Sequence, residues 1–148
     1  MTAHALTLTR LPDWPERLAL TIERARAVSF AWGTADCVNF AAACVHAVTG
    51  ADVLWPFRGG WSSALGAERI LRRRGGLVPA VSSVLGPGQQ GSALIQRGDV
   101  LLVGIERPWL AVCDGSRWWA PTRAGLVSGP AAAAGVFWPV GRVEVGNA

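Results

Sequence analysis

Residues 36–50 read DCVNFAAACVHAVTG, and this stretch decides how the chain folds. Asp36 is a preferred residue for capping the start of a helix and Gly50 for ending one, so the stretch predicts a helix from Cys37 to Thr49. The residues between the two caps are apolar almost all round the helix axis. A helix of this kind is buried on every side, so we expect it at the centre of the fold.

The neighbouring stretches carry further helix signals. Apolar residues recur at helical spacing over residues 15–28, which predicts a first helix with a proline in its opening turn. A third helix follows a serine cap, Ser62 or Ser63, and ends at Arg74, and a fourth spans residues 77–85. All four expected helices therefore precede residue 86.

The second half of the chain has the pattern of strands. Short runs of β-branched residues and leucine predict strands over residues 100–105 and 109–113, and Asp114-Gly115 is a strong hairpin signal before a third strand over residues 117–120. Two more strands are expected over residues 125–128 and 136–145. Helices followed by an antiparallel sheet predict an α+β domain, with the N-terminal helices packed on a small sheet.

Length and composition set the broad class of the protein. With 148 residues, 51% of them apolar and 16% charged, the chain is expected to form one domain over residues 1–148, with residues 1–10 as a flexible tail. No apolar run is long enough to span a bilayer, and the N-terminus lacks the pattern of a secretory signal.

The three cysteines, Cys37, Cys44 and Cys113, point to a reducing compartment, because an odd number without a signal peptide argues against disulfides. Their spacing matches no common metal site, so no metal and no other cofactor is expected. The net charge is +4 and the dense basic run is Arg72-Arg73-Arg74, which we interpret as a solvated helix end. Nucleic acid is therefore not among the expected partners.

Cys37 is the residue most suited to chemistry. At the first turn of a helix, the dipole and the free N–H groups favour a thiolate, and the same N–H groups can stabilise an oxyanion. The alternative is that Cys37 is a small buried apolar residue, which is the usual state of a free cysteine.

Two motifs around this cysteine resemble a known superfamily. Trp32-Gly33-Thr34-Ala35-Asp36-Cys37 resembles the tryptophan-glycine-x-x-aspartate-cysteine signature of NlpC-like cell-wall peptidases, which belong to the papain-like cysteine peptidase superfamily, and Arg97-Gly98-Asp99-Val100-Leu101 resembles their arginine-glycine-aspartate strand opening. The chain as a whole is similar to the small NlpC-like proteins encoded among the tail genes of siphophages. That likeness rests on residues 11–17, 30–37 and 112–115, the Arg58-Gly59 loop and the arginines before Gly75-Gly76.

The resemblance implies an NlpC/papain-like fold with Cys37 at the nucleophile position, but the other catalytic positions differ. In active members a histidine opens the second strand, and that position falls near Trp109 here. The third, orienting position falls near Ala120 or Pro121, and Ala35 stands where many close relatives have a histidine. None of these side chains accepts or orients a proton.

Neither of the two histidines replaces the missing base. His46 lies nine residues after Cys37 on the same helix, about 13 Å along its axis and on the opposite side. His4 falls in the expected N-terminal tail. A cysteine peptidase without a general base loses several orders of magnitude in rate, so we expect a catalytically degenerate member of the fold, with no catalytic residue and a vestigial Cys37.

The resemblance implies a structural or assembly component of a tailed-phage tail tip or baseplate. Such a protein is assembled in the cytoplasm of the bacterial host and resides in the virion tail. Its expected partners are other tail-tip or baseplate proteins, with peptidoglycan as a further candidate. Two alternatives remain open: an active peptidoglycan amidase or endopeptidase that uses Cys37 with His4 or with a partner's histidine, and a non-catalytic peptidoglycan-binding module.

Aromatic and arginine residues mark the candidate interface. Short strands bury only one face, and Trp and Arg are common interface anchors, so some of the eight tryptophans are expected near the surface. Trp118 and Trp119 are adjacent, so we expect one of the two rings to lie in the core. The interface candidates are Trp55, Phe57, Arg58, Trp61, Trp109, Arg117, Trp118 and Trp119.

Overall fold

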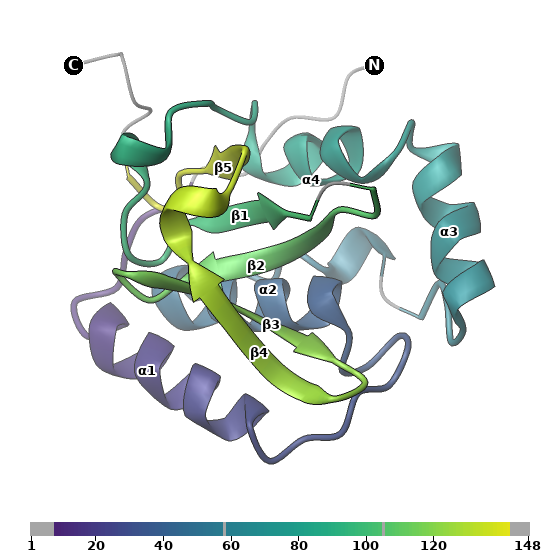
Figure 1. Cartoon of the computed structure of the whole chain (residues 1–148), viewed down its shortest axis with the longest axis horizontal. Coiled ribbons are helices and arrows are strands. Elements are labelled where there is room, and N and C mark those ends of the chain that lie inside the picture. Colours follow the sequence, from purple (N-terminus) through teal and green to yellow (C-terminus); the bar gives the residue numbers. More distant parts are fainter. Residues whose placement is uncertain (1–7, 58, 105, 143–148) are drawn as a thin grey trace.

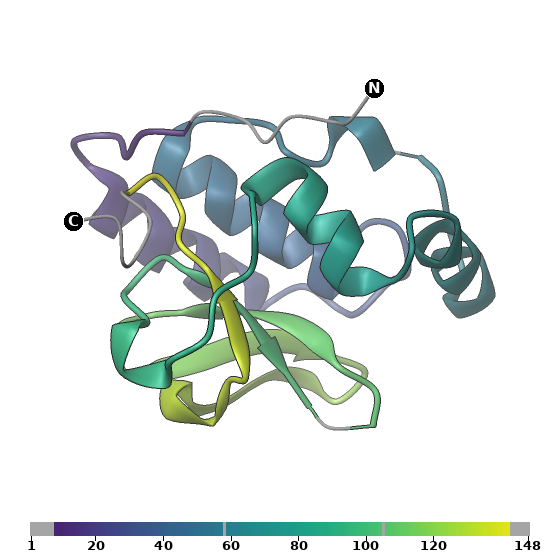
Figure 2. The ribbon, with the colours of Figure 1, turned by 90° about the horizontal axis from the view of Figure 1, so that it is seen from above.

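A computed structural model of the chain describes residues 8–57, 59–104 and 106–142, and these residues form an α+β fold (Figure 1). The helices are α1 (Trp14–Ala25), α2 (Cys37–Thr49), α3 (Ala64–Arg73) and α4 (Leu77–Leu85). The strands are β1 (Val100–Val103), β2 (Trp109–Cys113), β3 (Arg117–Thr122), β4 (Gly125–Pro130) and β5 (Val136–Trp138). They form one antiparallel sheet in the order β4-β3-β2-β1-β5, with α1, α2 and α4 on one side of it (Figure 2). The expected α+β class, with N-terminal helices packed on a small antiparallel sheet, is confirmed.

The central helix α2 has the bounds that its caps predict. The Asp36 carboxylate accepts a hydrogen bond from the Asn39 N–H, and Gly50 adopts a left-handed φ of 79°. The helix packs against α1 on one side and against β2 on the other. Six of its residues are buried: Phe40, Ala41, Cys44, Val45, Ala47 and Val48. It therefore occupies the centre of the fold.

Helix α1 ends earlier than its apolar spacing predicts. The N–H groups of Arg26, Ala27 and Val28 donate to carbonyls three residues back, so the helix tightens and closes after Ala25. Val28, expected on the buried face, is 57% exposed. The prediction of a helix to residue 28 was therefore wrong by one turn.

Four of the strand predictions need correction at their ends. Strand β1 stops at Val103 because Gly104 leaves the extended conformation with φ of 92°. Strands β3 and β4 are longer than expected and pair up to Thr122 and Pro130. Strand β5 ends at Trp138 because Pro139 has no N–H to continue the ladder, and residues 105 and 143–145 lie outside the described part of the chain.

Alternate residues of the sheet enter two apolar clusters. On the helix side, Val100 and Val112 pack with Val45 and with Trp138, which is fully buried. On the other side, the buried residues are Leu101, Val103, Ala111, Cys113, Ala120, Ala134 and Phe137. The helix-side cluster includes residues from α1, α2, α4 and the sheet, so it is the main core of the domain.

A buried carboxylate ties the two ends of the described chain to β1. Asp99 is fully buried and accepts hydrogen bonds from Arg142 (Nε at 3.0 Å), from the Gln96 N–H at 2.9 Å and from Arg10 (Nη2 at 3.5 Å). From the sequence alone, Asp99 is expected only to form a turn before the strand that begins at Val100. Residues 1–7 of the expected tail lie outside the described part, and its last residue, Arg10, is held here and by a bond to the Val140 carbonyl.

Candidate functional site

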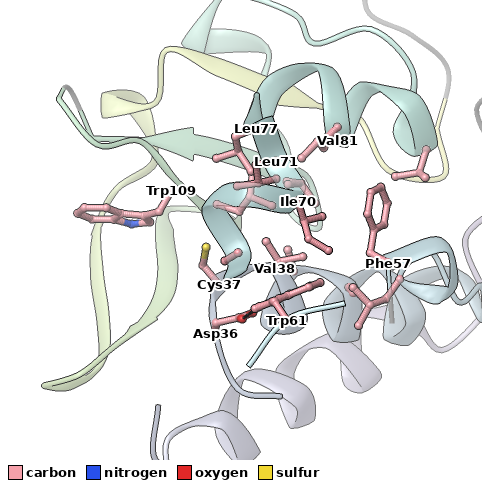
Figure 3. Close-up of a pocket in the computed structure, with 18 of the residues that line it drawn as sticks. Asp36, Cys37, Val38, Phe57, Trp61, Ile70, Leu71, Leu77, Val81 and Trp109 are labelled. Carbon is pink, nitrogen blue, oxygen red and sulfur yellow. Dashed lines mark hydrogen bonds between the residues drawn. The ribbon is translucent and has the colours of Figure 1, made fainter. Parts of the chain in front are cut away.

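An apolar cavity of about 340 Å³ opens between α2, α3, α4 and the start of β2 (Figure 3). Cys37 and Trp109 lie at one end of it and Phe57 at the other (Figure 3). Four lining residues are charged or carry a titratable thiol: Asp36, Cys37, Glu68 and Arg107. The cavity is therefore suited to apolar groups.

Helix α3 forms one wall of the cavity. Ala64, Ala67, Ile70 and Leu71 line it from one face of the helix, and no residue of α3 is buried. The helix lies at one end of the molecule (Figures 1 and 2). Its apolar face is thus turned toward the open cavity and not toward a closed core.

Asp36 fixes the loops at the floor of the cavity. Its carboxylate is 2% exposed and accepts four hydrogen bonds, two of them from Asn39. The other two come from the Gly33 N–H at 2.8 Å and from the Trp61 indole N–H at 2.7 Å. Asp36 therefore joins the start of α2 to two loops, one before it and one 25 residues after it.

The thiol of Cys37 is held in its protonated form. Burial raises the pKa of Cys37 to about 11, against opposing effects of the Leu110 backbone and of the first N–H groups of α2, and the neighbouring Asp36 carboxylate raises it further. The expectation that the helix N-terminus would favour a thiolate is therefore corrected, since desolvation outweighs it. Cys37, Cys44 and Cys113 are free thiols, and burial also raises the pKa of the other two.

The start of β2 lies beside this thiol. Trp109 opens the strand, and the backbone of the next residue, Leu110, interacts with Cys37. The structure thus brings together Cys37 and the position at which the resemblance expects a histidine. His46, the histidine within the described residues, lies near the other end of α2 and is exposed, while His4 is outside the described part.

The candidate interface residues of the first aromatic loop differ widely in exposure. Trp55 is 70% exposed, whereas Trp61 is partly buried and donates its indole N–H to Asp36. The Arg74 guanidinium stacks over the Phe57 ring at 4.6 Å, and Arg58 lies outside the described residues. Trp55 is therefore the most accessible aromatic anchor of this loop.

The candidates on the sheet lie on both of its faces. Trp118 packs on the cluster facing away from the helices and stands edge-on to Trp109, which is 36% exposed. Trp119 packs on the helix-side core and donates its indole N–H to Asp114 at 2.7 Å. Both rings are partly buried, and Trp119 is the one that packs against the main core. Arg117 is exposed and bonds to the Ser128 hydroxyl.

Sequence reasoning missed two features of this site. The apolar face of α3 was detectable, because Ala64, Ala67 and Leu71 recur at helical spacing. The unpaired indole N–H of Trp32 was not detectable from the sequence. Trp32 lines the cavity, and this N–H is buried and has no hydrogen-bond partner among the described residues. Such an orphaned donor depends on the packing of distant segments.

We expect Cys37 to react slowly with iodoacetamide at pH 7, and the rate to rise about tenfold per pH unit up to pH 10. The reason is that only the thiolate reacts, and the pKa of about 11 keeps the thiol protonated below that pH. Peptide mass spectrometry reads the label at this position, with Cys37→Ala as the blank. A rate that levels off below pH 8 would contradict the raised pKa.

Within the described residues, no three His, Cys, Asp or Glu side chains are grouped so that they could hold a metal ion. In the same part of the chain, no helix combines the length and the apolar character needed to cross a membrane.

Comparisons with known proteins give one match. No curated protein and no solved structure is significantly similar to this chain. A family model described as "Domain of unknown function (DUF6950)" matches residues 9–140, which include every helix and strand described above. The chain therefore belongs to the DUF6950 family.

Proposed function

We propose that this protein is a non-catalytic docking component of a tailed-phage tail tip or baseplate, or an assembly factor for it, built on a degenerate NlpC-like fold. The placement of Cys37 in an apolar cavity beside Trp109, which opens β2, is the observation that carries the non-catalytic part of the proposal. The phage part rests on the resemblance to small NlpC-like tail proteins.

The electrostatics around Cys37 argue against peptide hydrolysis. A cysteine peptidase attacks with a thiolate that is formed by a neighbouring base. With a pKa of about 11, only about one thiol in ten thousand is ionised at pH 7. The residue that opens β2 next to it is Trp109, whose indole accepts no proton.

The exposed aromatic residues support a docking role. Trp55 is 70% exposed and Trp109 is 36% exposed, and large accessible aromatics are enriched where proteins meet. Of these two residues, Trp109 lines the cavity.

Incubation of the purified protein with peptidoglycan sacculi tests the non-catalytic role. We expect no release of soluble muropeptides from wild type or from Cys37→Ala, measured by chromatography and mass spectrometry. Release by the wild type that is lost in the folded Cys37→Ala variant would establish the peptidase alternative instead. Co-sedimentation with sacculi without release would favour the peptidoglycan-binding module.

Mass spectrometry of particles tests the tail assignment. In phage particles whose genome encodes this chain, we expect the protein in the tail fraction, or tails that fail to assemble when its gene is deleted. Normal infectious particles formed without the gene would contradict both forms of the proposal.

A further inference from the structure

We propose that the cavity between α2, α3 and α4 binds a peptide segment of a partner protein whose apolar side chains are flanked by carboxylates. The inference rests on the proposed function in one respect, namely that the cavity binds a segment and does not cleave it. Three independent observations define the chemistry of the occupant.

The first observation is the apolar lining. The volume of about 340 Å³ lies in the range of sites that enclose small groups, and the walls are formed by side chains such as Val38, Leu71 and Val81. The two carboxylates of the lining already have partners: Asp36 accepts four hydrogen bonds, and Glu68 pairs with Arg72 at 3.1 Å. A bound segment therefore gains by burying apolar surface and meets few competing charges.

The second observation is the orphaned donor on Trp32. Its buried indole N–H has no partner among the described residues, and a buried donor without an acceptor is unfavourable. A peptide backbone carries carbonyl acceptors along its whole length, whereas the methylene chain of a fatty acid carries none. Trp32 lines the same cavity, so this donor favours a peptide over an acyl chain.

The third observation is the charge at the rim. Arg107 lines the cavity from the loop before β2, and the exposed Arg74 stacks over the ring of Phe57, which also lines it. Glu68, the exposed acid of the lining, is paired with Arg72. The rim is therefore positive overall, and carboxylates beside the apolar side chains complement it.

Two labelled synthetic peptides with the same apolar core, one flanked by glutamates and one by lysines, test this inference by fluorescence anisotropy. We expect the acidic peptide to bind at least tenfold more tightly in low salt, with the difference shrinking as salt is added, because rim charges are screened. Equal binding of the two peptides, or binding of neither, would overturn the proposal.

Two substitutions locate the binding. Ala67 lines the cavity from α3, so Ala67→Trp fills it, and we expect binding of the acidic peptide to fall at least tenfold. Leu65 on the same helix is 56% exposed and does not line the cavity, so Leu65→Trp is the matched control and should bind as wild type does. If Ala67→Trp lacks the wild-type circular dichroism spectrum, Ala64→Phe replaces it in the test. Undiminished binding to the folded cavity-filled variant would place the occupant elsewhere.

A third variant tests the orphaned donor. Trp32→Phe removes the indole N–H and keeps an aromatic ring, and we expect it to weaken the acidic peptide several-fold. Displacement of that peptide by laurate at lower concentration than by unlabelled peptide would identify an acyl chain as the occupant and overturn the proposal. None of these binding results depends on the sacculus assay. If the peptide does not bind as expected, the non-catalytic role is unaffected. Release of muropeptides from sacculi would refute the non-catalytic role, whatever the binding results.

Discussion

Replacement of Asp99 with alanine is expected to lower the free energy of unfolding by about 4 kcal/mol. The carboxylate is fully buried, and its removal leaves Arg10 and Arg142, whose side chains are 14% and 15% exposed, without their shared counter-charge. Domains of this size are stable by roughly 5–15 kcal/mol, so the loss is a large part of the total. Urea unfolding followed by circular dichroism measures it.

Glu68→Ala is the matched control for this prediction. Glu68 also pairs with an arginine, Arg72, but both side chains are more than 60% exposed, so the expected change is below about 0.5 kcal/mol. A loss for Asp99→Ala as small as that of the control would show that the two arginines find other partners.

Replacement of Asp36 with alanine is expected to cost about 3 kcal/mol of unfolding free energy and to release the Trp61 loop. The substitution removes the acceptor of four hydrogen bonds, among them the N-cap of α2 and the bond from the Trp61 indole. The indole N–H resonance of Trp61 in a ¹⁵N-correlated NMR spectrum should move toward the position of a solvated tryptophan.

Asp36→Asn separates the two effects. The amide keeps one acceptor oxygen in the same place, so we expect about half of the loss. An unchanged Trp61 resonance in folded Asp36→Ala would contradict the assignment of this carboxylate as the anchor of the loop.

The parts of the fold that the sequence predicts are those whose signals are local. The bounds of α2 follow from Asp36 and Gly50, which act within one turn of the helix. The end of α1 could not be predicted in this way, because the apolar spacing continues to Val28 while the backbone tightens after Ala25. The extension of β3 and β4 was also missed, since it depends on how the two strands pair with each other.

In the candidate site, too, features with local signals could be predicted and features that depend on distant contacts could not. The position of Cys37 at the start of a central helix could be predicted, but the direction of its pKa shift could not, because burial by distant segments outweighs the local helix dipole. Asp99 was interpreted as a turn residue, which is correct for its bond to Gln96. Its ion pairs were invisible, since Arg10 lies 89 residues before it and Arg142 lies 43 residues after it.

The close approach of the first and last described segments bears on how this domain can be combined with others. A Cβ placed on Gly141 would lie 3.2 Å from the backbone nitrogen of Arg10, so the polypeptide enters and leaves the fold at one point. Domains whose entry and exit adjoin can be inserted into a surface loop of a host protein or circularly permuted without a cut through the core. The described fold of this chain therefore has the geometry that insertion into a loop of another protein requires.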